Sequence, residues 1–230
     1  MKTEVLPLHL AAHTRHALHR DERVWPETNC YVDLWIELLH ALDLDPVAAM
    51  GFSLALDFEG DQWRFFKFAT ADLAELYGID VQELAIWRPV EWHLREQIDA
   101  GRPVIVEVDA FYLPDTAGTS YRADHVKTSI AAQMIDPDAA RLGYFHNAGY
   151  YELDGDDFAG VFRAEGAALP PYCEFVRLDR LRRREPADLV NRAAALGRVH
   201  LARRAADNPV RRYRARFTRD LAWLRGEGLP

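Results

Sequence analysis

Cys30 is the residue of this sequence best placed to act as a nucleophile. It directly follows Thr28 and Asn29, either of which can cap a helix, and apolar residues recur with helical spacing after it. A cysteine in the first turn of a helix lies against exposed backbone N–H groups and the positive end of the helix dipole, and both favour the thiolate. These residue types allow nucleophilic catalysis at Cys30, whereas the ordinary role of a lone cysteine is that of a small buried core residue.

A thiolate nucleophile needs a proton acceptor, commonly a histidine whose ring is oriented by a third polar residue. His125 precedes an expected strand at 128–136, and Asn147 ends an expected strand at 141–147. If the DPDA turn between these strands is symmetric, residues whose numbers sum to about 275 face each other, so His125 lies opposite Tyr150. A bulge or small register change would bring His125 and Asn147 together, which makes them the candidate base and orienting residue.

The elements that must position these residues follow one another in blocks. Helical spacing with start and stop signals predicts helices over residues 30–42, 46–56, 70–78 and 89–101. Period-two or β-branched stretches predict strands over 103–111, 128–136, 141–147 and 172–178. Two Arg-rich helices follow Pro186, separated at Asn208-Pro209. This order predicts an α+β fold with a mostly antiparallel sheet, rather than alternating βαβ units.

Charge divides the chain into an acidic body and a basic end. Up to residue 176 the sequence holds 13 Lys and Arg against 30 Asp and Glu, a net charge of −17, whereas the remainder holds 15 Arg against 6 acids, a net charge of +9. We expect one domain over 1–180 and an Arg-rich helical extension over 181–230. The extension either folds back onto the body or presents a docking surface for an acidic partner.

Composition and motifs exclude several classes of protein. The sequence has neither GxGxxG nor GxxxxGK[ST], and its acidic body argues against nucleic acid as a partner. Cys30 and Cys173 lie far apart with no CxxC pair, which excludes a disulfide framework and a Cys-rich zinc site. No apolar run is long enough for a membrane span, and no secretory signal is expected. We therefore expect a cytoplasmic protein without a membrane partner.

Other polar groups have ordinary explanations. His9, His13 and His16 would share one helical face, but no carboxylate or cysteine is fixed beside them, so we predict a solvated segment and no metal site. Asp33 and Glu37 lie four apart on the helix of Cys30, where a solvated face is expected.

Five segments together resemble one bacterial family, the domain of unknown function numbered 1839. They are VWPETNCYVDLWIELLHALDLDP, ALDFEGDQWRFFKF, LYGIDVQEL, VEVDAFYLPDTAGTSYRADHVKT and GYFHNAGYYEL. More distantly, the chain is similar to the N-terminal domain of butirosin biosynthesis protein H, an acyltransferase. That likeness rests on a cysteine at a helix start, a strand running into D-x-F/Y-Y-L-P, a histidine and a later polar residue.

The resemblance implies a papain-like cysteine-protease fold, with a helical lobe packed on an antiparallel sheet and a basic C-terminal helical tail. It implies Cys30 as nucleophile, His125 as general base and Asn147 as orienting residue. Because the usual upstream glutamine is absent, the backbone N–H of Cys30 and the side chain of Asn29 or Thr28 are the expected oxyanion donors.

The implied function is acyl or aminoacyl transfer in a biosynthetic pathway, from a carrier-protein thioester through Cys30 to a small-molecule amine. The protein itself needs no cofactor, since phosphopantetheine belongs to the acyl or peptidyl carrier protein. Carrier proteins are generally acidic, and six arginines of the extension could bind one: Arg203, Arg204, Arg211, Arg212, Arg214 and Arg216. A cysteine peptidase or amidase and a non-catalytic scaffold of a biosynthetic assembly are the alternatives.

Overall fold

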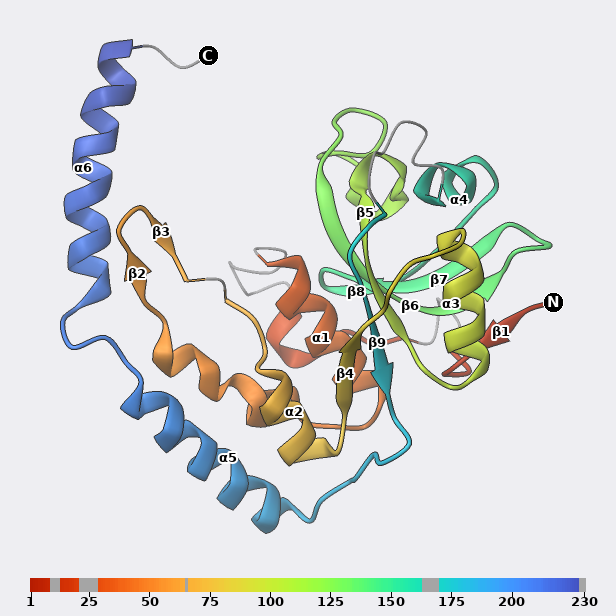
Figure 1. Cartoon of the computed structure of the whole chain (residues 1–230), viewed down its shortest axis with the longest axis horizontal. Helices are drawn as coiled ribbons and strands as arrows, with labels where there is room; N and C mark the ends of the chain where they lie inside the picture. The colour runs from red at the N-terminus through yellow and green to blue at the C-terminus, as the bar shows by residue number, and fades with distance from the viewer. Residues whose placement is uncertain (9–12, 21–28, 65, 163–169, 228–230) are drawn as a thin grey trace.

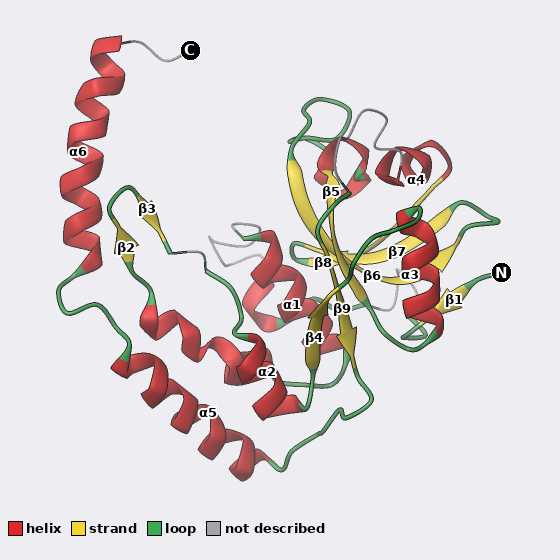
Figure 2. Cartoon of the chain, in the orientation of Figure 1, coloured by secondary structure: helices red, strands yellow, loops and turns green. Residues whose placement is uncertain are grey.

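The centre of the protein is an antiparallel β-sheet with helices on both faces (Figures 1 and 2). The computed structural model describes residues 1–8, 13–20, 29–64, 66–162 and 170–227. Across the sheet, the strands are β4 (Asp80–Glu83), β9 (Cys173–Arg177), β5 (Val104–Asp109), β6 (Lys127–Asp136), β7 (Arg141–His146) and β8 (Gly149–Asp154). The short strand β1 (Thr3–Glu4) also pairs with β6, and every pairing is antiparallel. The expected α+β class is confirmed.

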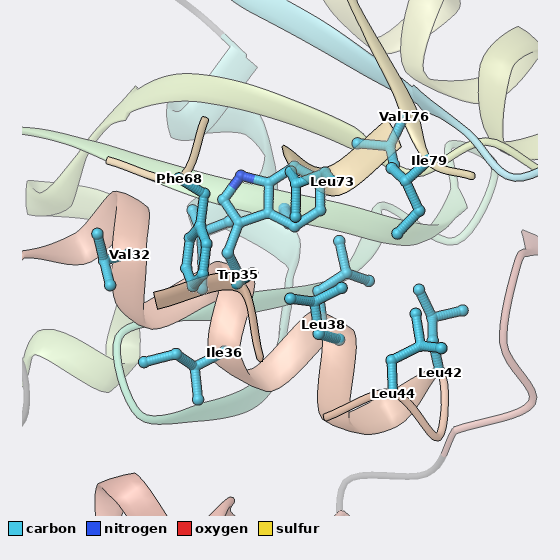
Figure 3. Close-up of a cluster of buried hydrophobic side chains, with 14 of the residues drawn as sticks. Val32, Trp35, Ile36, Leu38, Leu42, Leu44, Phe68, Leu73, Ile79 and Val176 are labelled. Carbon is cyan, nitrogen blue, oxygen red and sulfur yellow. The ribbon is translucent and has the colours of Figure 1, made fainter. Parts of the chain in front are cut away.

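One face of the sheet is covered by α1 (Cys30–Ala41), behind which lie η3 (Pro46–Ala55) and α2 (Thr70–Tyr77). Apolar residues at helical spacing make α1 the centre of this core, and Trp35 is fully buried among them (Figure 3). Ile105 from β5 belongs to the same hydrophobic cluster. The sequence pattern that predicts α1 therefore also fixes which of its sides faces the sheet.

The opposite face is covered by α3 (Val90–Asp99) and α4 (Gly155–Phe162). Leu94 and Ile98 of α3 pack against residues such as Val106, whose side chains point away from α1 because successive strand residues alternate between faces. Each face of the sheet thus has its own apolar core. The sheet also separates the polar side chains on the α1 face from those on the face covered by α3 and α4.

All the predicted helices and strands are present, with one difference in type. Residues 46–55 form a 3-10 helix, capped by Asp45, whose carboxylate accepts a hydrogen bond from the N–H of Val47. The strands β1, β4 and β8 and the helix α4 are not predicted from the sequence pattern. β8 follows β7 through a two-residue turn at Asn147, where φ is +44°, a conformation that asparagine tolerates better than most residues.

The basic extension forms α5 (Pro186–Ala202) and α6 (Pro209–Glu227), the two predicted helices. α5 packs on η3, with Gly197 close to Gly51, and His200 is joined to Asp72 of α2 by a buried 2.6 Å contact. α6 instead extends from the body and contacts the hairpin of β2 (Phe58–Glu59) and β3 (Gln62–Trp63) (Figure 1). No helix within the described ranges is long and apolar enough to cross a membrane.

Candidate functional site

Cys30 is the first residue of α1, as the sequence predicts, and is half-buried. The helix is capped by Asn29, whose Oδ1 accepts a 3.2 Å hydrogen bond from the N–H of Val32 and whose Nδ2 donates a 2.7 Å bond to the carbonyl of Phe66. These bonds fix the first turn of the helix in place. The thiol therefore lies at the positive end of the α1 dipole.

A cavity of about 600 Å³ separates the start of α1 from the sheet. Its walls come from the start of α1, from Lys67 and from three neighbouring strands; the lining residues are Asn29, Cys30, Tyr31, Lys67, Ile105, Glu107, Lys127, Thr128, Ser129, Tyr172 and Glu174. This volume is in the range of pockets that hold small molecules. Cys30 thus faces a space large enough for a substrate.

The register of β5 and β6 determines which polar groups border this cavity. Glu107 pairs with Ser129 and Asp109 pairs with Lys127, so these residues belong to the sheet face that carries Ile105 and packs on α1. Lys127 Nζ lies 2.6 Å from Glu107 Oε1. The cavity therefore contains an ion pair on the sheet side, opposite the thiol.

His125 and Asp109 lie one step further along the same face. Two residues of strand advance about 7 Å, which is the offset of Asp109 from Glu107. His125 Nδ1 lies 2.5 Å from Asp109 Oδ2, and since a carboxylate only accepts, the ring carries its hydrogen on Nδ1. This leaves the Nε2 lone pair of His125 available as a base. Among the residues that the structure describes, His125 itself does not line the cavity.

The loop that carries His125 is held by aromatic and charged contacts. The His125 ring stacks on Phe111, with centroids 4.4 Å apart and an 11° angle between the planes. Arg122 pairs with Asp157 of α4, and its guanidinium lies over the ring of Tyr112. The His125 ring is therefore positioned by packing as well as by Asp109, although 66% of its side chain is exposed.

The structure replaces Asn147 with Asp109 as the partner of His125. The numbers of paired residues in β6 and β7 sum to 277 near the turn and to 276 beyond an irregularity between Ala132 and Met134, rather than to 275. Continuing that register places Asn147 level with Ser129, roughly 13 Å along the strand from His125. Asn147 instead occupies the tight turn before β8. A pair of His125 and Asn147 needs residue numbers that sum to 272, below 275, whereas the observed sums lie above 275. The register is therefore shifted away from the predicted pair.

Of the two side chains predicted to stabilise an oxyanion, Asn29 is already committed to capping α1 and to the carbonyl of Phe66. Thr28 lies outside the described residues. The backbone N–H of Cys30 belongs to the first helical turn, whose N–H groups have no acceptor within the helix. The backbone at the start of α1 is therefore a better-placed oxyanion donor than the side chain of Asn29.

The second cysteine has a contrasting environment. Cys173 on β9 is 1% exposed, and its Sγ donates to the carbonyl of Pro171 at 3.7 Å. Burial raises the pKa of the Cys173 thiol to about 12, with a further contribution from the charge of Glu107. Cys173 is thus an inert thiol within the same chain.

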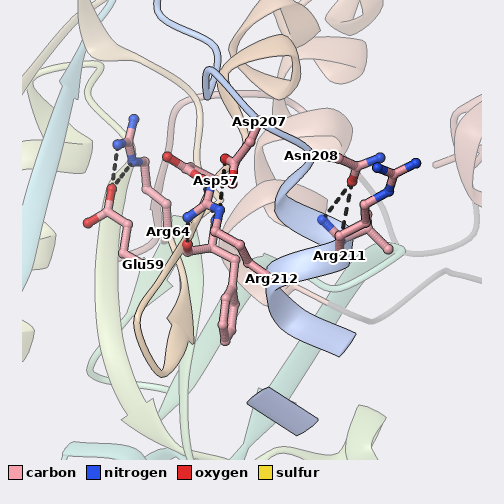
Figure 4. A network of polar contacts seen from close by, with 9 residues as sticks. Asp57, Glu59, Arg64, Asp207, Asn208, Arg211 and Arg212 are labelled. Atoms are coloured by element: carbon pink, nitrogen blue, oxygen red, sulfur yellow. Dashed lines mark hydrogen bonds and ion pairs between the residues drawn. The ribbon is translucent and has the colours of Figure 1, made fainter. Parts of the chain in front are cut away.

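The six arginines predicted to bind a partner fall into two groups, and Figure 4 shows one member of each, Arg212 and Arg211. Arg212 pairs with Asp57 and Asp207 and donates to a carbonyl of β2, and Arg216 pairs with Asp220. The other four are exposed and have no carboxylate partner among the described residues; they are Arg203, Arg204, Arg211 and Arg214. Part of the basic extension therefore folds onto the body, and part of it remains available.

The carboxylates expected on a solvated face of α1 are buried instead. Glu37 is 0% exposed, and its two oxygens lie 2.7 Å from His13 Nε2 and 2.5 Å from His19 Nδ1. His19 Nε2 lies 3.3 Å from Asp33. The prediction that His13 is solvated is therefore wrong, because its side chain is buried against Glu37. His9 lies outside the described residues. The ranges that the structure describes contain no group of three or more side chains arranged to hold a metal ion.

Burial raises the pKa of Glu37, but the hydrogen bonds from His13 and His19 outweigh it and lower the pKa to about 2. Burial likewise lowers the pKa of His19, but the hydrogen bonds and charges of Asp33 and Glu37 raise it to about 9. The N-terminal segment is consequently fastened to α1 by a buried ion pair near neutral pH.

Comparison with known proteins identifies the family of this chain. No curated protein matches the chain. The DUF1839 N-terminal domain matches residues 14–178, a range that contains Cys30, Asp109, His125 and the strands that border the cavity. Since this match covers more than half of the sequence, the protein belongs to the DUF1839 family.

Proposed function

We propose that this protein is a cysteine-dependent acyltransferase with Cys30 as nucleophile, His125 as general base and Asp109 as the residue that orients His125. The observation that carries the proposal is the position of Cys30, at the start of α1 and facing a cavity whose sheet wall continues to the His125–Asp109 pair. A cysteine helix packed against a sheet that carries a histidine is also the arrangement of a papain-like fold. That fold is part of the proposal.

The chemistry proceeds in two balanced steps. In the first, the Cys30 thiolate attacks the carbonyl of an acyl thioester, the carbon–sulfur bond of the donor breaks, and the leaving thiolate takes a proton from protonated His125. In the second, a neutral amine attacks the Cys30 thioester, His125 takes up the proton from nitrogen, and an amide forms as Cys30 leaves. The N–H groups at the start of α1 stabilise the oxyanion in both steps.

The donor that this proposal favours is a thioester on an acyl or peptidyl carrier protein. Carrier proteins are acidic, and α6 presents exposed arginines with no carboxylate partner among the described residues, including Arg211 and Arg214. Opposite charges speed the encounter of two proteins and orient it. The carrier would bring its own phosphopantetheine arm, so the protein supplies the cysteine, the base and the docking charge.

Hydrolysis is the second candidate, favoured by the exposure of His125. With 66% of its side chain exposed, water can reach the base and attack the thioester in place of an amine. A cysteine amidase or peptidase therefore differs from the transferase only in the acceptor. A non-catalytic scaffold, by contrast, would have an ordinary thiol at Cys30.

The first experiment measures the pH dependence of iodoacetamide labelling at Cys30 and Cys173 by peptide mass spectrometry. Rapid labelling of Cys30 well below pH 8.5, lost in the His125→Ala variant, supports an activated thiolate. Cys173, which is buried and has a raised pKa, is the internal control. Slow labelling of Cys30 in both proteins would leave the scaffold as the better explanation.

The second experiment separates transfer from hydrolysis. The protein is incubated with an acetyl thioester of N-acetylcysteamine, and the acetyl adduct on Cys30 is identified by mass. The adduct is then followed with and without a primary amine. Acceleration by the amine with formation of the amide supports transfer, whereas an amine-independent rate of loss supports a hydrolase.

A further inference from the structure

We infer that Glu174 binds the ammonium group of a ligand inside the Cys30 cavity, and that this ligand is the amine acceptor. The first part stands on the cavity alone, whereas the second part rests on the proposed function. Glu174 lies on β9 beside Ile105 of β5, on the sheet face that Cys30 opposes. It therefore borders the same cavity as Cys30.

Glu174 is a buried carboxylate whose hydrogen bonds come from two phenols. It is 5% exposed, and its oxygens accept bonds from the hydroxyl of Tyr31 at 2.6 Å and from the hydroxyl of Tyr172 at 2.8 Å. No Lys, Arg or His of the described residues forms an ion pair with it. Buried carboxylates are ordinarily paired with a cation, because desolvation of an unpaired charge is costly.

Glu107 shows what the ordinary arrangement looks like in the same cavity. Its carboxylate is paired with Lys127 at 2.6 Å, on the adjacent strand. Lys67, the other lysine of the cavity, has its Nζ 5.6 Å from the centre of the Tyr31 ring and forms no ion pair with Glu174. The cavity therefore has one carboxylate whose charge is matched within the chain and one whose charge is not.

The two tyrosines add a second element of cation recognition. Tyr31 and Tyr172 both line the cavity, and the faces of aromatic rings attract ammonium groups. Lys67 over the Tyr31 ring shows that a cation is accommodated there. A carboxylate between aromatic rings is suited to an alkylammonium ion, whose charge it neutralises and whose carbon chain can pack on the rings.

The acceptor is the substrate that carries such a charge. Alkylamines have pKa values of roughly 10, as lysine does, so an acceptor amine reaches the protein as an ammonium ion at neutral pH. The acyl thioester of the donor is uncharged at its reacting end. Glu174 would thus concentrate the acceptor beside Cys30 and leave the donor thioester unaffected. The bound ammonium ion gives up one proton to solvent before the neutral amine attacks, and His125 then takes the second proton as the amide forms.

The test measures binding in the Cys30→Ala protein, which cannot carry out acyl transfer. The probe is n-butylammonium chloride, titrated by calorimetry, with 1-butanol as the uncharged comparison. We expect butylammonium to bind, 1-butanol to bind at least 10-fold more weakly, and Glu174→Gln to weaken butylammonium binding by about 10- to 100-fold. The matched control Glu107→Gln removes the paired carboxylate of the same cavity and should change the dissociation constant less than 3-fold.

A second variant keeps the test independent of folding defects at a buried position. Tyr172→Phe retains the ring and the Glu174 carboxylate but removes one donor, so butylammonium should bind equally or more tightly. The inference is overturned by any of three results: no detectable butylammonium binding, equal binding to Glu174→Gln, or loss of binding in Tyr172→Phe of unchanged melting temperature. The two proposals can also be separated. If butylammonium binding depends on Glu174 but iodoacetamide labelling shows an unreactive Cys30 thiol in the unsubstituted protein, the cation site is supported and the proposed acyltransferase is contradicted.

Discussion

The two faces of the sheet carry the same pair of side chains in opposite settings. On the α1 face, His125 Nδ1 lies 2.5 Å from Asp109, and their side chains are 66% and 34% exposed. On the other face, His146 Nδ1 lies 2.5 Å from Asp115, and their side chains are 2% and 1% exposed. The two pairs therefore have the same nitrogen–oxygen distance but differ greatly in their exposure to solvent.

The buried pair is geometrically the more complete of the two. His146 Nε2 lies 2.8 Å from the hydroxyl of Thr128, so a hydroxyl, an imidazole and the Asp115 carboxylate form a continuous chain. Tyr144 donates to the other oxygen of Asp115. These bonds occupy both nitrogens of the His146 imidazole, which leaves neither free for a substrate. The comparison teaches that a buried histidine–carboxylate pair is suited to stabilising the fold, whereas an exposed pair such as His125 and Asp109 is accessible enough for the base that we propose.

The largest expected effect is on the reactivity of Cys30 when the exposed pair is broken. Asp109→Asn replaces an obligate acceptor with an amide that can also donate, so the ring of His125 is no longer held with its hydrogen on Nδ1. We expect the acyl-transfer rate to fall by roughly 10²- to 10⁴-fold. The free energy of unfolding should change by less than about 0.5 kcal/mol because His125 is largely exposed and Asp109 is partly exposed. A loss of stability comparable to the loss of rate would assign the exposed pair a structural role.

The reciprocal substitution on the buried face should affect stability and leave reactivity unchanged. Asp115→Asn keeps one oxygen acceptor and replaces the other with an amino group, so either His146 or Tyr144 is left buried without an acceptor. We therefore expect a loss of about 1 to 3 kcal/mol in the free energy of unfolding. Urea denaturation measures this loss. The iodoacetamide rate at Cys30, measured where the variant remains folded, should match that of the unsubstituted protein. A slower Cys30 in a folded Asp115→Asn protein would show that the two faces are coupled.

A third histidine–carboxylate pair extends the comparison to pH. The pKa of His19 is raised to about 9, so its contribution to stability is complete below pH 6.5 and is lost as the pH rises through 9. The pKa of Glu37 is lowered to about 2, so its contribution is complete above pH 4.5 and is lost as the pH falls through 2. The stabilisation by this pair is therefore greatest between about pH 4.5 and 6.5.

Chemical denaturation at a series of pH values tests this window. Raising the pH from 6 to 10 should remove roughly 3 kcal/mol in the unsubstituted protein, and this dependence should be much smaller in His19→Gln. His125→Gln is the matched control, since that histidine is exposed. An equal pH dependence in the two variants would contradict a stabilising role for the His19–Glu37 pair.

Local patterns in the sequence predict the elements of this fold but not the contacts that define its polar groups. Helical spacing and capping place Cys30 at the start of α1, where it is found. The partner of His125 is determined instead by the pairing of β5 with β6, whose connection from 110 to 126 has no turn chemistry that fixes a register. Glu37 likewise lies on a charged stripe of α1 that the distant segment of His13 and His19 covers. These contacts depend on tertiary packing, which a pattern of neighbouring residues does not contain.

The smallest expected effects concern the two groups of arginines on α6. Arg211 and Arg214 are exposed and have no carboxylate partner among the described residues, whereas Arg212 of the same helix pairs with Asp57 (Figure 4). Reversing the first two to glutamate should leave the free energy of unfolding nearly unchanged, and Arg212→Ala should lower it only slightly, because ion pairs at the surface are weak.

The same variants separate docking from packing. In stopped-flow measurements with an acidic carrier protein, the double Arg211→Glu and Arg214→Glu variant should associate more slowly at low ionic strength and approach the unsubstituted rate as salt screens the charges. Arg212→Ala should change the association rate less, since its charge is already neutralised by Asp57. An association rate that is insensitive to all three substitutions would remove α6 from the carrier interface, while the chemistry proposed at Cys30 would stand on its own evidence of thiol reactivity.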